Sequence, residues 1–254
     1  MKIIISPAKK MKTDIDTLEP RTMPVFLKEA KVLLEWLGKL SYEEAKRLWN
    51  CNDKIAAWNY DRVQTMDLET QLTPAILSYE GIQYQYMAPA VFEERAMEYI
   101  QRHLCILSGF YGVVKPLDGV RPYRLEMQAK AHLGKARNLY EFWGNKIYQE
   151  VTGTGEGEVI LNLASKEYAK CVEAYLKPAD QYLTCVFGEW SGGKVRQKGT
   201  LAKMARGEMV RYMAENEVED LERIRGFDRL GYQFSKSLST DDTYVFLKEE
   251  KSEL

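Results

Sequence analysis

The side chains best suited to chemistry follow one short apolar run of this sequence. Leu104–Leu107 are all apolar, which predicts a buried strand that Ser108 and Gly109 end. One interpretation is that these residues form only a buried strand followed by turns, without a functional role. The turns predicted between positions 116 and 122, however, lead to a phenol, a guanidinium and a carboxylate. These groups belong to Tyr123, Arg124 and Glu126. They are typical of a site at the C-terminal end of a strand, in which Glu126 could serve as a general base.

Two other predicted strands end in polar residues in a similar way. Lys2–Ser6 predicts a first strand, and Val159–Leu163 predicts a later one that leads to Ser165. Ser165 could cap a helix that begins at Lys166, where free N–H groups and a lysine together would favour an anion. A plain strand-to-helix turn is the alternative. One hypothesis is thus an enzyme acting on a nucleotide or a DNA base, with candidate catalytic residues Glu126, Tyr123 and Ser108 in a pocket built from Ser6, Ser108, Tyr111, Tyr123, Arg124, Glu126, Asn162, Ser165 and Tyr168.

The charge of the sequence is segregated, although its net value is only −1. Residues 1–12 contain four lysines and no acid, whereas residues 115–137 and 191–211 each contain six basic residues and at most two acidic ones. If the three segments meet, they form one basic face for nucleic-acid phosphates. If they do not, they are separate solvated surfaces. The residues that we expect to contact DNA are Lys9, Lys10, Arg121, Arg124, Lys166, Lys203, Arg206 and Arg211.

A helix is predicted over residues 200–216, within the third basic segment. Its spacings of three and four residues would place Lys203, Arg206 and Arg211 along one side. Gly207 interrupts this pattern and costs up to ~1 kcal/mol relative to alanine in a helix. Because glycine has no side chain, we expect another backbone to approach closely there.

Residues 41–66 predict two short helices joined by a three-residue turn. Ser41 and Glu44 have the spacing of a capping box for the first helix, and Asp53 is expected to cap the second. The unit resembles a helix–hairpin–helix, which binds DNA phosphates through backbone N–H groups. It lacks the glycine pair typical of DNA-binding versions, so a helical hairpin that merely packs is the alternative.

Histidine and cysteine residues are few and scattered. Neither His103 nor His132 has a cysteine or carboxylate partner at ligand spacing, and the four cysteines form no C-x-x-C pair. We therefore expect no metal site and no bound cofactor. No apolar run approaches the ~18 residues needed to span a bilayer. The N-terminus also lacks the apolar stretch of a secretory signal, so we expect a cytoplasmic protein.

The predicted strands and helices are mixed irregularly along the chain. They include a strand over Ala75–Tyr79 and a helix from Leu139 to about Glu150. No linker is long enough to separate domains. We therefore expect a single α/β domain over residues 1–254, with a mixed β-sheet or partly closed barrel surrounded by helices.

Several longer motifs resemble one known family. The central stretch SGFYGVVKPLDGVRPYRLEM, residues 108–127, is similar to the signature of the YaaA family of bacterial peroxide-stress proteins. The resemblance covers nearly the full length and implies an unusual fold of its own. It also implies a cytoplasmic protein that binds DNA and limits oxidative damage, in part by keeping intracellular iron low. The supporting motifs occur in the family's order: ISPAK at 5–9, NLASKEYAK at 162–170, KMARGEMVRY at 203–212 and GFDRLGYQF at 226–234.

Two functional classes follow from these observations. The first is a protective protein that binds double-stranded DNA, including distorted or bulged duplexes, with its basic segments on phosphates and some of its 16 tyrosines on exposed bases. The second is the enzyme with a pocket at the strand ends. The resemblance favours DNA binding. The sequence leaves open the oligomeric state, the preferred DNA structure, whether iron is bound directly and whether any bond is broken.

Overall fold

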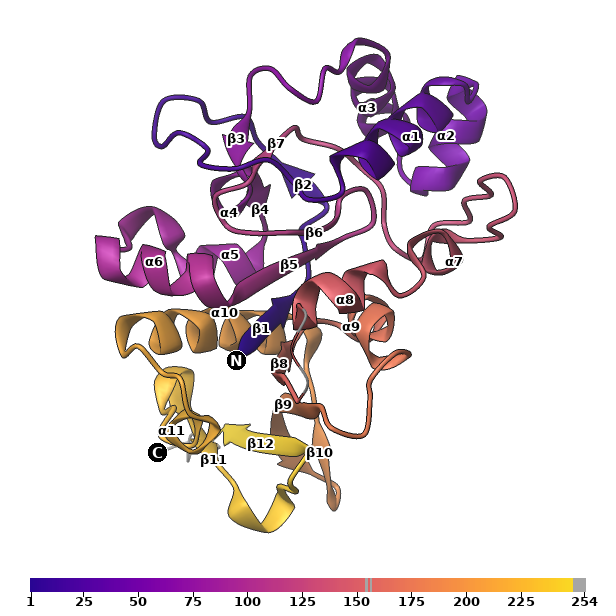
Figure 1. Cartoon of the computed structure of the whole chain (residues 1–254). Helices are drawn as coiled ribbons and strands as arrows, with labels where there is room; N and C mark the ends of the chain where they lie inside the picture. The colour runs from indigo at the N-terminus through magenta and orange to yellow at the C-terminus, as the bar shows by residue number, and fades with distance from the viewer. Residues whose placement is uncertain (154, 156, 249–254) are drawn as a thin grey trace.

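A computed structural model describes residues 1–153, 155 and 157–248. Its main feature is one mixed sheet, shown in Figure 1. The strands of this sheet are β1 Lys2–Ile5, β5 Leu104–Ser108, β6 Gly112–Val114, β8 Val159–Leu163, β9 Gln181–Ser191, β10 Lys194–Arg196, β11 Tyr232–Phe234 and β12 Thr243–Lys248. Their order is β11-β12-β9-β8-β1-β5-β6, with β10 paired to β9.

The middle of the sheet is parallel and its edges are antiparallel. β1 pairs in parallel with β5 and with β8, and the parallel pairing continues through β9 to β12. Ile3, Ile4 and Ile5 are fully buried, as expected for a central strand that is covered on both faces. Within the described residues the edge strands β6 and β11 do not pair with each other. The mixed α/β fold is therefore confirmed, and the barrel alternative is wrong because the sheet stays open.

Helices cover the sheet and extend beyond one end of it. In the view of Figure 1, α5, α6 and α10 lie to the left of β1, α8 and α9 lie to its right, and α1, α2 and α3 gather at the top. The helices are α1 Leu27–Gly38, α2 Tyr42–Trp49, α3 Asp53–Thr65, α4 Ala75–Ser78, α5 Ile82–Met87, α6 Glu94–His103, α7 Leu139–Trp143, α8 Lys146–Thr152, α9 Lys166–Glu173, α10 Gly199–Glu215 and α11 Leu221–Ile224. Short strands complete the chain: β2 Lys10–Met11, β3 Thr73–Pro74, β4 Tyr79–Glu80 and β7 Gly119–Val120.

The close backbone approach expected at Gly207 is present. A Cβ atom on Gly207 would lie 2.1 Å from the carbonyl oxygen of Gln83, in α5. α10 therefore packs directly on the backbone of α5, which only glycine permits at this point. The contact fixes α5 beside the carboxyl ends of β1 and β8.

Some local predictions are wrong, and each has a local cause. Ala75–Tyr79 is not a strand, because Ala75–Ser78 form the short helix α4; a short buried apolar run fits either structure. The helix expected from Leu139 is broken at Gly144, which has φ +51° and ends α7. In the hairpin the capping box of α2 is confirmed, but Asn52 rather than Asp53 caps α3.

Candidate functional site

The strand order creates a crevice between β1 and β8. After β1 the chain next enters the main sheet at β5, on one side of β1, whereas after β8 it enters at β9, on the other side. Adjacent strands whose connections leave in opposite directions form a topological switch point. In open α/β sheets, ligands bind there, outside the carboxyl ends of the strands.

Two serines meet across this switch point. The backbone N–H of Ser165 donates to Oγ of Ser6 at 2.8 Å, and the Ser6 hydroxyl donates to Oγ of Ser165 at 3.2 Å. Tyr84 donates its hydroxyl to the Ser6 carbonyl at 2.9 Å. Ser165 stands at the N-cap of α9 as predicted, but its side chain makes no capping hydrogen bond. Both hydroxyls are thus held at the crevice rather than used inside the helix.

The three basic segments of the sequence meet around this crevice. It is a cleft of about 520 Å³, which we call the strand-end cleft. Residues 6–10 form part of its wall, residues 123–126 form another part, and Lys203 and Arg206 reach it from α10. The basic side chains that line it outnumber the carboxyl groups: Lys9, Lys10, Arg124, Lys203 and Arg206, with Glu80, Glu126 and Glu167.

The cations of the cleft differ in depth. The side chains of Lys9 and Lys10 are 65% and 72% exposed, and each pairs with a cleft carboxylate. The side chain of Arg124 is only 12% exposed and lies 3.9 Å from Glu126. Burial also lowers the pKa of Arg206 from its ordinary value. The lysines therefore form a solvated rim, and the arginines lie deeper.

Three of the residues predicted to contact DNA lie outside the lining of the cleft. Arg121 donates to the backbone carbonyls of Thr70 and Gln71 instead. Arg211 pairs with Glu215 one helical turn further along α10, at 2.7 Å. Lys166 is exposed in the first turn of α9. The structure therefore brings together Lys9, Lys10, Arg124, Lys203 and Arg206, but not Arg121, Lys166 or Arg211.

Of the candidate catalytic residues, Tyr123 and Glu126 line the cleft, whereas Ser108 lies behind Tyr123. Oγ of Ser108 accepts the N–H groups of Phe110 and Tyr111, so its own hydrogen is left for the Tyr123 oxygen at 2.6 Å. Burial raises the pKa of Tyr123 to about 12. Ser108 is therefore suited to orient a neutral Tyr123 and not to attack a ligand.

A second carboxyl group was missed by the sequence analysis. Glu167 lines the cleft from the first turn of α9, and its Oε1 accepts the N–H of Gln128 at 3.2 Å. Burial raises the pKa of Glu167, and the charge of Glu126 raises it further. Glu126 itself is paired with Lys9 at 2.8 Å. One protonatable and one ion-paired carboxyl group thus share the cleft.

We predict that Glu167→Gln stabilises the protein at neutral pH but not in acid. A carboxyl group whose pKa is raised on folding destabilises the folded state fully at pH values above its folded pKa. This destabilisation disappears at pH values below its unfolded pKa. The free energy of unfolding should therefore rise at pH 7 and be unchanged at about pH 3, well below the pKa of a glutamate in the unfolded chain. Urea unfolding of both proteins at the two pH values measures this. An equal gain at both would contradict the titration of Glu167 as its cause.

The helical hairpin of α2 and α3 borders a neighbouring hollow. This hollow, of about 440 Å³, shares Lys9 and Glu126 with the cleft and adds Arg47, Asn50 and Lys130. The N-terminus of α3 carries Asp53, which pairs with Lys46 at 2.5 Å. The turn of the hairpin therefore lies beside the cleft, although a carboxylate occupies part of the position where a phosphate would approach α3.

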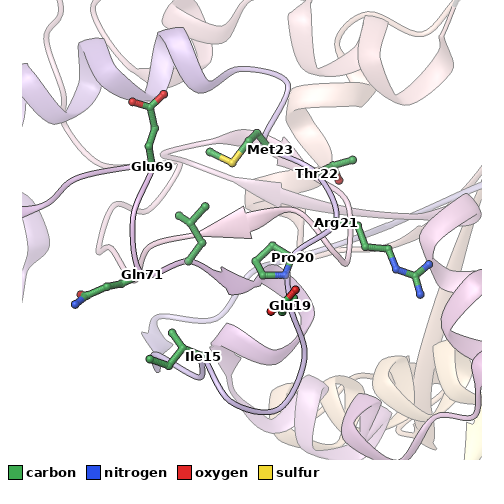
Figure 2. Close-up of a pocket in the computed structure, with 9 residues that line it drawn as sticks. Ile15, Glu19, Pro20, Arg21, Thr22, Met23, Glu69 and Gln71 are labelled. Atoms are coloured by element: carbon green, nitrogen blue, oxygen red, sulfur yellow. The ribbon is translucent and has the colours of Figure 1, made fainter.

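Another hollow, of about 500 Å³, lies between the loop before α1 and residues 69–72. Figure 2 shows Ile15, Pro20 and Met23 along it, whereas the charged ends of Arg21 and Glu69 point in different directions. Because its polar groups do not converge, this hollow is a weaker candidate than the strand-end cleft.

Neither a metal site nor a membrane span is found in the residues that the structure describes. Within them, no three His, Cys, Asp or Glu side chains come together as metal ligands would. Over the same residues, every helix is too short or too polar to cross a bilayer.

The fold and cleft define a class of protein: an α/β domain with an open mixed sheet and a cation-lined cleft at its switch point. The chain belongs to the YaaA family, whose model, described as "Peroxide stress protein YaaA", matches residues 1–238. This confirms the resemblance seen in the motifs.

Full-length relatives are similar throughout. A UPF0246 protein of Agathobacter rectalis is 57% identical over 246 residues, which cover 97% of this chain and 98% of the relative. UPF0246 proteins of Lachnoclostridium phytofermentans and Desulfitobacterium hafniense are each 56% identical, over 99% and 98% of this chain and 98% of each relative.

Proposed function

We propose that the protein binds double-stranded DNA during peroxide stress, with the rim of the strand-end cleft against the phosphates. The observation that supports this proposal is the meeting of the three basic segments around one cleft. Charge segregated along the sequence thereby becomes charge concentrated in space.

The arrangement of the cations fits phosphate contacts better than base reading. The lysines of the rim are exposed to an approaching backbone, and the hairpin turn lies beside them. We therefore expect affinity for duplexes of any sequence, with a preference for distorted or bulged ones whose bases are accessible.

Replacing Lys203 by alanine is the direct test of the cleft. We expect weaker binding to a fluorescent duplex and a fall of ~0.9 in the slope of log affinity against log salt concentration. Arg211→Ala is the matched control, because Arg211 lies on the same helix but pairs with Glu215 outside the cleft. Equal losses for the two variants, or affinity that does not depend on salt, would exclude the cleft as the phosphate surface.

The family resemblance adds a role in limiting intracellular iron, which we include in the proposal. We propose that the protein does this without holding iron itself, since no cluster of three ligand side chains is found among the described residues. Elemental analysis of protein purified without chelators should find far less than one iron per chain. Stoichiometric iron would contradict this part of the proposal.

A second candidate function is an enzyme acting on a nucleotide or a DNA base. The pair of carboxyl groups favours it, because burial raises the pKa of Glu167 while Glu126 is paired with Lys9, and carboxyl groups in such different environments suit a general acid and a general base. Tyr123 would add a neutral phenol at the same wall of the cleft, with its hydroxyl held by Ser108 and Tyr79. DNA binding alone does not require this pair.

A further inference from the structure

We propose that the inner part of the strand-end cleft binds a single nucleotide, either free or turned out of a DNA strand. The second source rests on the proposed DNA binding, and the first does not. The chemistry is the same in both cases: one phosphate at the cations of α10 and one planar base against the inner wall.

The size of the cleft is the first argument. A volume of about 520 Å³ lies within the range of pockets that enclose small molecules. It is too small for a segment of duplex, whose backbone can touch only the exposed rim. The residues inside the cleft therefore face a ligand that is smaller than the duplex at the rim.

The cations of α10 are the second argument. Lys9 and Lys10 have carboxylate partners, whereas Lys203 and Arg206 form no ion pair within the described residues. Nε of Arg206 is buried and has no hydrogen-bond partner there. The serine pair at the start of α9 adds hydroxyl groups and the positive end of a helix. A phosphate would supply the missing acceptors.

Gln83 is the third and most specific argument. Its side chain lines the cleft although the residue is only 6% exposed, and its Nε2 has no hydrogen-bond partner among the described residues. A buried amide without a partner is unfavourable unless something else satisfies it. The edge of a base offers both a donor and an acceptor to such an amide.

The lining around Gln83 suits a base. Ile82, Tyr84, Leu125 and Tyr168 provide apolar and aromatic surface in the same cleft. The contact of Gly207 with the Gln83 backbone fixes this wall next to Arg206, the residue before Gly207 in α10. The base-binding and phosphate-binding groups are therefore held together by one packing contact.

Calorimetric titration with AMP, GMP, CMP and UMP tests the proposal. We expect at least one to bind, and its nucleoside and inorganic phosphate to bind at least tenfold more weakly, because each supplies only half of the contacts. Absence of binding by all four nucleotides, or equal binding by phosphate alone, would overturn the proposal.

Gln83→Met separates ligand binding from folding. Methionine keeps the length of the side chain and removes the unsatisfied amide, so we expect an unchanged or higher melting temperature with at least tenfold weaker nucleotide binding. Arg206→Lys should also weaken binding, whereas Arg211→Ala on the same helix should not. Unchanged nucleotide affinity in a folded Gln83→Met protein would overturn the role of this wall.

Oligonucleotides distinguish the two sources. Tighter binding to a duplex with a one-nucleotide bulge than to a fully paired duplex, reversed by the bound mononucleotide, would support a nucleotide turned out of DNA. Mononucleotide binding without duplex binding would support a free nucleotide and reject the proposed DNA-binding function. Binding of paired duplex alone, with no mononucleotide binding and no preference for the bulge, would overturn this inference and leave DNA binding intact.

Discussion

Gly207→Ala is expected to destabilise the protein by about 3 kcal/mol or more. The added Cβ would lie 2.1 Å from the Gln83 carbonyl oxygen, a backbone atom that cannot rotate away. α5 and α10 would have to separate, which removes apolar contacts along both helices. The gain in helix propensity, ~1 kcal/mol, is too small to compensate. Urea unfolding followed by circular dichroism measures the change.

Gly199→Ala is the matched control for this prediction. Gly199 begins the same helix, and a Cβ on it would meet no atom within 4 Å. We expect unchanged or slightly higher stability for this variant. A Gly207→Ala protein as stable as the Gly199→Ala protein would show that α5 does not depend on this contact.

The strands of the sheet were predictable because of where they lie. β1, β5 and β8 are covered on both faces, so each contains at least three consecutive apolar residues, and each is followed within two residues by serine or glycine. The same feature made α4 unpredictable, because a buried run of four residues fits a helix equally well. The order of the strands depends on long-range pairing, for which the sequence pattern carries no signal.

The site was partly predictable for a related reason. Residues that follow parallel strands must meet at one edge of the sheet, so Ser6 and Ser165 line one cleft. Arg124, which follows β7 outside the main sheet, reaches the same cleft. The same rule could have identified Glu167, two residues after Ser165. Gln83 and Tyr84 carry no such signal, because only the packing of α10 on α5 brings them there.

Two predicted DNA-contacting arginines lie outside the strand-end cleft, and they show that counting charges along a sequence does not identify which side chains share a surface. Arg121 is held by the backbone of residues 70 and 71, and Arg211 by a glutamate one helical turn away. Helical spacing placed Arg211 on the side of Lys203 but could not show which partner it would choose. Segregated charge therefore indicated that the basic segments meet, without identifying which of their side chains line the cleft.

Glu126 separates the two functional classes, because each class gives it an opposite role. It pairs with Lys9 at 2.8 Å and lies 3.9 Å from Arg124, so in a DNA-binding protein it reduces the positive charge of the cleft. In an enzyme it is the candidate general base. Glutamine has nearly the same shape and hydrogen-bonding reach but neither the charge nor the basicity.

We expect Glu126→Gln to tighten duplex binding by up to about tenfold at low salt, with a steeper salt dependence, because two cations become available to phosphates. Protection of a peroxide-sensitive host should persist. Glu98→Gln, at an exposed position of α6, serves as a control for the same charge change outside the cleft lining. Anisotropy titration and survival after peroxide measure the two effects. Lost protection in a folded Glu126→Gln protein with unchanged DNA affinity would indicate a lost chemical step and favour the enzyme.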